Sequence, residues 1–339
     1  MSPQFVDFDA DGKLDIVLGI FDGSPHLVRG TDKGWAAPEQ ILDQDGNRIV
    51  FNQFWNFDAK KWDTTKRHDA PGHSGEGHLT SAIAFDIDGD GDLDLVLGDH
   101  SSGRVFTRTN TGTPQQPKFS TVNELLHADG KPIEVPGTVA TLRLVDWNRD
   151  GRMDLACGSM GDAFGNEEGG GVWVFLDRGA GRAASFGAPI QLLERSKKGG
   201  TDPTRPDSGL YMDFGDHDGD GDLDMVVGGY SHWTPKPREL SAEETKRVGE
   251  LKAEQAKAGA ELHELERTIE AAVKDLTGGA AEAKRNELFE ANRAKFIAFG
   301  KRGQVLQQEI DMLVPGAKRM SFVWLYENTA VVEATAPRK

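Results

Sequence analysis

The chain has 339 residues, enough for one large domain or two smaller ones, and 37% of them are apolar, which is sufficient for a buried core. Asp and Glu total 55 against 39 for Lys and Arg, so the net charge of −16 makes the surface a poor match for nucleic acid or anionic lipid. No run of eighteen apolar residues occurs, so no membrane span is predicted. Cys157 is the only cysteine, which excludes an internal disulfide and favours a small buried filler in its apolar run.

Four nine-residue acidic loops recur along the chain and contain seventeen carboxylates in total. They begin at Asp7, Asp86, Asp146 and Asp216, and read DFDADGKLD, DIDGDGDLD, DWNRDGRMD and DHDGDGDLD. Oxygen-bearing side chains stand at positions 1, 3, 5 and 9, which suits Ca²⁺, an ion that binds about six to eight oxygens. Glycine at position 6 permits the bend that lets position 7 offer its backbone carbonyl. Solvated turns are the alternative for one such loop, but four copies in one register predict calcium sites.

Each loop is followed by an apolar triplet and a glycine, and is preceded by another short apolar stretch. The triplets with their glycines span residues 16–19, 95–98, 155–158 and 225–228, and stretches such as 82–85 and 142–145 precede the loops. Short apolar runs bounded by turn residues are typical of buried strands, so each loop is predicted to join two strands. Third strands are expected at 104–107, 172–175 and 322–326, and fourth strands at 35–42, 119–126 and 186–193.

The predicted unit is therefore four short strands, with loop starts 79, 60 and 70 residues apart. Repeats of this length and strand content are typical of propeller blades or a related array. The Asp-x-Asp-x-Asp-Gly-x-x-Asp loop with its apolar strand and glycine resembles the FG-GAP/VCBS repeats of integrin-alpha-type β-propellers, over residues 3–233 and 318–330. The layout is also similar to secreted FG-GAP proteins of planctomycete type.

This resemblance implies an all-β propeller with four visible blades, and calcium between the first two strands of each blade. Either the four blades close on themselves, or they belong to a larger ring with sequence upstream, which we favour. The implied segments are blades over residues 1–239, an inserted helical hairpin over 240–315, and completion of the fourth blade with the tail over 316–339. The implied calcium ligands, with position 7 contributing its carbonyl, are Asp7, Asp9, Asp11, Lys13 and Asp15; Asp86, Asp88, Asp90, Asp92 and Asp94; Asp146, Asn148, Asp150, Arg152 and Asp154; and Asp216, Asp218, Asp220, Asp222 and Asp224. Because Asn148 replaces a carboxylate and Arg149 and Arg152 add positive charge, we expect the third site to be the weakest.

The composition changes between the second and third strands of the fourth repeat. Ser241 and Glu244 form a capping-box pattern that opens a helix, and Thr277-Gly278-Gly279 interrupts the helical pattern before a second helix ends near Pro315. These helices are predicted to form an antiparallel coiled-coil hairpin. Its functional interpretation is a protein-docking arm, and its alternative is a self-paired hairpin that binds nothing. The predicted apolar stripes are Val248, Leu251, Ala258, Leu262, Leu265, Ile269, Ala272 and Leu276 on the first helix, and Phe289, Phe296, Phe299, Leu306, Ile310 and Leu313 on the second.

The connection from Asn47 to Leu79 is the other unusual segment, because long loops on a rigid scaffold often have a function. Its aromatic residues either stack on sugars or cover a face of the sheets, and its histidines either bind a transition metal or are structural. Those residues are Phe51, Phe54, Trp55, Phe57 and Trp62, with His68, His73 and His78. Residues 99–100, 166–168 and 231–233 are further candidates to line one end of the ring.

We find no nucleophile–base–acid set and no phosphate-binding glycine loop in the sequence, so an enzyme is not favoured. The sequence predicts a calcium-stabilised extracellular binding or adhesion module for a protein or a glycan. The alternative is a polysaccharide-active lyase or hydrolase built on the same scaffold. Calcium sites of this kind suggest a secreted, extracellular or periplasmic location. Residues 1–5 contain no export signal, so the signal is expected upstream or the protein is not exported.

Overall fold

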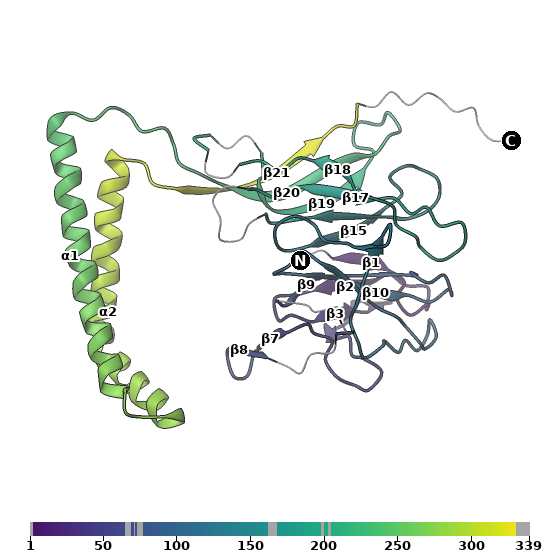
Figure 1. Cartoon of the computed structure of the whole chain (residues 1–339), viewed down its shortest axis with the longest axis horizontal. Coiled ribbons are helices and arrows are strands. Elements are labelled where there is room, and N and C mark those ends of the chain that lie inside the picture. Colours follow the sequence, from purple (N-terminus) through teal and green to yellow (C-terminus); the bar gives the residue numbers. More distant parts are fainter. Residues whose placement is uncertain are drawn as a thin grey trace. The chain divides into compact units, whose positions relative to one another are not determined.

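A computed structural model of the chain describes residues 3–64, 69–70, 72, 77–161, 168–197, 200–202 and 205–329. The contacts divide the chain into two compact units (Figure 1). A β-sheet unit comprises Met1–His232 and Arg319–Lys339, and a helical unit comprises Trp233–Lys318. Neither helix of the described chain has the length and apolarity that a membrane crossing requires.

Four antiparallel sheets follow one another along the β-sheet unit, and each contains one acidic loop. Their strands, in the order in which they pair, are β1 (Gln4–Val6), β2 (Asp15–Gly19), β3 (Pro25–Val28) and β6 (Glu39–Gln40); β9 (Leu79–Phe85), β10 (Asp94–Asp99), β11 (Val105–Arg108) and β12 (Glu124–Leu125); β15 (Thr141–Val145), β16 (Asp154–Gly158), β17 (Val172–Phe175) and β18 (Ile190–Leu193); and β19 (Ser208–Gly215), β20 (Asp224–Trp233) and β21 (Lys318–Tyr326). The predicted first, second and third strands are confirmed, while the fourth strands are shorter than predicted. The candidate outer strand after Thr329 lies outside the described residues.

Three short hairpins complete the described strands. They are formed by β4 (Gly30–Thr31) with β5 (Gly34–Trp35), β7 (Gln53–Asn56) with β8 (Lys61–Thr64), and β13 (His127–Ala128) with β14 (Lys131–Pro132). The β7–β8 hairpin belongs to the long 47–79 connection. That connection therefore contains regular structure of its own.

Continuous hydrophobic clusters join each sheet to the next. Val17 packs in one cluster with Leu79 and Leu95 of the second sheet. Ile83 of the second sheet shares a cluster with residues of the third, including Cys157. A third cluster contains residues of the third and fourth sheets. Cys157 is fully buried, and burial raises the pKa of its thiol, so its predicted role as a core filler is confirmed.

In the first three repeats, the glycine that follows the apolar triplet is required by this packing. A Cβ atom on Gly19 would lie 2.7 Å from the carbonyl carbon of Thr80 in the next sheet. A Cβ on Gly98 would lie 2.2 Å from the Ala140 oxygen, and one on Gly158 would lie 2.5 Å from the Leu210 oxygen. Because these neighbours are backbone atoms, they cannot move aside as a side chain would. The repeated glycine therefore sets how closely successive sheets approach.

The helical unit contains two long helices, α1 (Ala242–Val273) and α2 (Gly278–Leu313), which lie side by side (Figure 1). The predicted capping box is confirmed: Ser241 Oγ accepts the Glu244 N–H, and the Glu244 carboxylate accepts the Ser241 N–H. Leu251 of α1 packs with Leu306 and Ile310 of α2. Ion pairs such as Arg247 with Glu309 and Arg285 with Glu270 show that the helices run antiparallel.

The predicted apolar stripe is wrong near the connection between the helices. Val273 is buried, whereas Ala272 is exposed and Leu276 is 40% exposed. A straight helix repeats every 3.6 residues, so a buried row continues from Ile269 to the position four residues later. Phe289 is also 38% exposed although it was placed on the stripe of the second helix.

Candidate functional site

The acidic loops connect the first and second strands of the four sheets, as the spacing predicted. Position 1 follows the first strand directly, and position 9 begins the second strand. Thus Asp86 follows β9, and Asp94 is the first residue of β10. All four loops consequently lie at the same ends of their strand pairs.

The aspartate at position 9 has the same two hydrogen bonds in every repeat. Its Oδ2 accepts a backbone N–H from position 2 of its own loop, at 2.9–3.0 Å. Its Oδ1 accepts the N–H of the second residue after the end of the third strand, at 2.7–2.9 Å. The four pairs of this second kind are Asp15 with Gly30, Asp94 with Asn110, Asp154 with Asp177, and Asp224 with Asn328.

These position-9 carboxylates are at most 1% exposed, so they join the loop to the third strand inside the fold. Asp224 makes this hydrogen bond to a residue 104 positions away, across the whole helical unit in sequence. The fourth repeat is therefore completed by β21 after the insertion. Position 9 was predicted to be a calcium ligand, and this structural role has no signal in the sequence because the donor lies at a different distance along the chain in each repeat.

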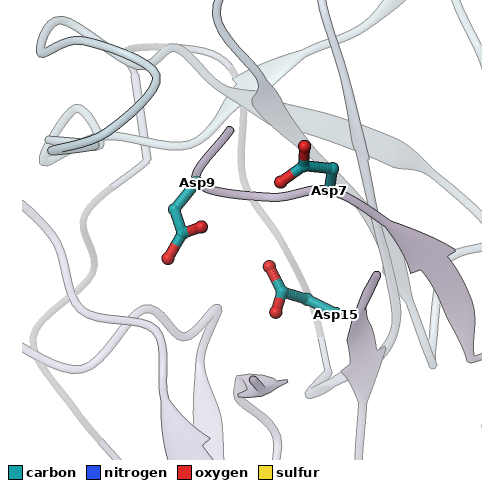
Figure 2. A group of neighbouring side chains, drawn as sticks. All are labelled: Asp7, Asp9 and Asp15. Atoms are coloured by element: carbon teal, nitrogen blue, oxygen red, sulfur yellow. The ribbon is translucent and has the colours of Figure 1, made fainter. Parts of the chain in front are cut away.

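Carboxylate oxygens converge in three of the loops. One ligand atom from each of Asp7, Asp9 and Asp15 lies within 4.8 Å of the others, and Figure 2 shows the three side chains around a shared space. The second and fourth loops have similar groups, consisting of Asp86, Asp88 and Asp90 and of Asp216, Asp218 and Asp224. Several like charges this close together repel one another, and a bound divalent cation would neutralise them. An all-oxygen donor set fits Ca²⁺ best.

Position 7, predicted to offer only its backbone carbonyl, differs in side chain between the loops. In the second and fourth loops it is an aspartate. Asp92 and Asp222 are both buried, with only 6% and 4% of their surface exposed. Asp92 Oδ1 and both side-chain oxygens of Asp222 have no hydrogen-bond partner among the described residues. Burial, and then the charges of Asp90, Asp88 and Asp86, raise the pKa of Asp92 to about 6. The second and fourth loops therefore each hold a fifth, buried carboxylate beside the converging aspartates.

The first and third loops contain basic side chains instead. The Arg29 guanidinium contacts Asp9, and Lys13 Nζ lies 3.2 Å from Asp11 Oδ2. In the third loop, the Arg152 side chain forms an ion pair with Asp177 outside the loop, with Nη2 2.5 Å from Oδ2. Asn148 Nδ2 donates a hydrogen bond to Asp150 Oδ2 at 3.0 Å. No group of three converging acidic ligands is found in the third loop of the described chain. The four loops thus divide into two with five carboxylates and two with fewer carboxylates and a nearby cation.

A cavity of about 490 Å³ lies at the opposite ends of the strands from the acidic loops. Some lining residues come just before the first strand of a repeat or just after its second strand. The others lie within strands, in the half that is far from the acidic loop. They come from all four sheets: Ile20, Phe21, His78, Thr80, His100, Val139, Met160, Gly209, Tyr211, Gly228, Gly229, Tyr230 and Arg319. A five-residue strand such as β2 separates the two ends by roughly 15 Å.

Aromatic rings gather around this cavity. The rings of His78 and His100 are stacked with centroids 4.2 Å apart, and Trp62 lies 4.5 Å from His78. Phe21 makes an edge contact with Trp62 at 5.2 Å and is 62% exposed. Trp55 and Trp62 also contact each other, at 5.7 Å. Two aromatics of the long 47–79 connection are therefore brought beside the cavity, whereas Phe51 is fully buried in the core.

Burial lowers the pKa of His78 to about 4, and the charge of His100 acts in the same direction. The folded pKa of His78 is thus below that of a free histidine, so the folded state favours the neutral imidazole. The contribution of this preference to the free energy of unfolding is fully present above about pH 6.5 and is lost as the pH falls towards 4. We expect acidification from pH 7 to 5 to cost wild type on the order of 1 kcal/mol more stability than His78→Gln.

Thermal unfolding of both proteins at the two pH values, in saturating calcium, measures this difference. The control is His263→Gln on α1, whose side chain is 75% exposed. An equal loss of stability in wild type and His78→Gln would show that His78 does not titrate in this range.

Only some of the other residues predicted to bind a ligand or a metal can be placed in the structure. His68, His73, Asn166 and Glu167 lie outside the described residues. His100 lines the cavity, and His232 packs edge-on against Tyr230 at 5.4 Å. The convergence of His78 with His100 was missed because 22 residues separate them, and a two-residue contact leaves no periodic signal in the sequence.

The sequence matches the FG-GAP-like repeat family over residues 86–157 and again over residues 146–227. Both matches begin at an acidic loop, and each extends into the second strand of the following repeat. No curated protein matches the chain. The matched segments coincide with loops, strands and hydrogen bonds that the structure repeats in all four sheets. The chain contains FG-GAP-like repeats over residues 86–227.

Proposed function

We propose that this protein is an extracellular binding module in which calcium stabilises a β-propeller made of the four sheets, and in which the cavity end binds a ligand. FG-GAP repeats suggest an extracellular binding or adhesion module. The observation that supports the assignment most directly is that the acidic loops and the aromatic cavity lie at opposite ends of the same strands. Such an arrangement separates a stabilising site from a recognition site.

Calcium in this proposal has a structural role. When bound, it supplies positive charge that offsets the repulsion among the loop carboxylates. The chain's own residues prepare the sites: position 9 fixes the loop to the third strand, and positions 1 and 5 accept backbone N–H groups within the loop, such as Asp7 from Gly12 at 3.0 Å. The loops are thereby ordered before an ion enters, which limits the entropy lost on binding.

We expect the four sites to differ in affinity, with the second and fourth tightest and the third weakest. More ligand charge favours Ca²⁺, whereas Arg29 and Lys13 must be displaced from the carboxylates of the first loop. Calorimetric titration of wild type, Asp88→Ala, Asp218→Ala and Asp146→Ala tests this order. The first two variants should each lose a tight transition, and the third should lose only a weak one. Loss of the tightest transition in Asp146→Ala would contradict the order.

The binding role is tested by presenting calcium-loaded protein to panels of immobilised glycans and extracellular proteins. Tyr230→Ala, which truncates a ring of the cavity wall, should lose the captured ligand. Phe289→Ala, which truncates an exposed ring on α2, is the matched control and should keep it. Capture that survives Tyr230→Ala would place recognition elsewhere on the molecule.

A further inference from the structure

The cavity has one cationic side chain whose position is informative. Arg319 lines it, and its guanidinium lies over the ring of Tyr230 at 3.8 Å from the centroid. Arg319 is exposed, and no ion pair joins it to a carboxylate among the described residues. In a chain with a net charge of −16, a guanidinium held by a ring and left without an acidic neighbour is available to an anionic ligand.

Two buried polar atoms in the same wall lack partners. His78 is only 8% exposed, yet its Nε2 has no hydrogen-bond partner in the described structure, and the same is true of Thr80 Oγ1. Both residues line the cavity. A buried polar atom without a partner is costly, so such atoms commonly mark a place where a ligand completes the hydrogen bonds. A neutral imidazole and a hydroxyl can each donate or accept, which suits a ligand with several hydroxyl groups.

The remaining wall is aromatic and aliphatic. Phe21, Tyr211 and Tyr230 contribute rings, and Ile20, Val139 and Met160 contribute aliphatic surface. A volume of about 490 Å³ lies within the range of roughly 300–1,000 Å³ typical of small-ligand sites. The C–H face of a pyranose ring packs well on aromatic rings of this kind, while its hydroxyls can form hydrogen bonds with polar atoms of the wall.

The shape and charge of the site argue against other ligands. The lining residues are strand ends from four sheets rather than one long edge strand, so a peptide has no continuous strand there to extend. The net charge of −16 repels a polyanion, whereas one guanidinium matches one carboxylate. Building on the binding role proposed above, we propose that the cavity binds a sugar unit that bears a single carboxylate, such as the terminal uronic acid residue of a glycan.

The test compares methyl glucuronide with methyl glucoside, which differ at the carboxylate, in calorimetric titrations of the calcium-loaded full chain. Wild type should bind the glucuronide at least about tenfold more tightly, as expected for a charge-assisted contact. Arg319→Gln should bind both probes equally, and Arg319→Lys should keep part of the preference. His78→Gln and Thr80→Val should weaken both probes alike. Arg302→Gln on α2, which removes an arginine paired with Glu254, is the control and should match wild type.

Equal binding of the two probes by wild type would overturn the inference, as would tighter binding of benzoate or a carboxyl-terminal peptide than of the glucuronide. A preference that persists in Arg319→Gln would overturn the role of that residue. These results would contradict the carboxylate preference without contradicting the proposed binding role of the protein. If the panels yield a neutral glycan or a protein whose capture requires Tyr230, the module stands and only the carboxylate preference falls. If no ligand is captured at all, the proposed binding role also falls.

Discussion

Removal of calcium by EDTA is expected to lower the midpoint of thermal unfolding of the β-sheet unit by on the order of 10–20 °C. At free calcium about 100-fold above Kd, each site contributes about 2.7 kcal/mol to the stability of the folded state. The second and fourth loops, each with five carboxylates, should contribute most. A destabilisation of about 5 kcal/mol in a domain of this size corresponds to a shift of roughly 10–20 °C.

Tryptophan fluorescence reports this transition well, because six of the seven tryptophans lie in the β-sheet unit. A double variant, Asp88→Ala with Asp218→Ala, supplies the control: EDTA should lower its midpoint much less than that of wild type, because only the first and third loops are left to bind calcium. Restoration of the wild-type midpoint by calcium but not by an equal concentration of magnesium would establish ion specificity, since Mg²⁺ keeps its water shell more strongly. An unchanged midpoint on chelation of wild type would refute a structural role for calcium.

Replacement of Asp94 by alanine is expected to destabilise the protein by about 2–5 kcal/mol even in EDTA, because one buried and one partly buried backbone N–H group lose their acceptor. Those groups belong to Ile87 and Asn110, at 3.0 and 2.7 Å from the carboxylate. The effect differs from that of a pure metal ligand. Asp88→Ala, two loop positions after Asp86, should destabilise the calcium-loaded protein but leave the metal-free protein nearly unchanged, since it also removes a repelling charge.

Chemical denaturation of wild type and both variants, with calcium and with EDTA, separates the two roles. Asp224→Ala extends the test to the fourth repeat, where the hydrogen bond to Asn328 closes the chain across the helical insertion. If Asp94→Ala and Asp88→Ala behave alike in EDTA, position 9 is only a ligand and its hydrogen bonds contribute little.

The loops, the first two strands of each repeat, the third strands of the last three repeats and the helical insertion were predictable from the sequence, because each depends on residues close together in the chain. The third strand of the first repeat, β3, was not predicted. Ligand spacing within nine residues, an apolar triplet before glycine, and the Ser241–Glu244 capping box are local patterns of this kind. The stripe on α1 failed only at its end, where a heptad count departs from the true helical repeat.

Tertiary structure decided the features that combine distant residues. The second hydrogen bond of the position-9 aspartates reaches donors 15 to 104 residues away, and Arg29 reaches Asp9 across 20 residues. The cavity joins strand ends from four sheets, so neither the His78–His100 stack nor the contact of Arg319 with Tyr230 has a signature in the sequence. An acidic loop of this kind is encoded locally because one turn supplies all its carboxylates. A recognition site between sheets depends instead on how those sheets pack.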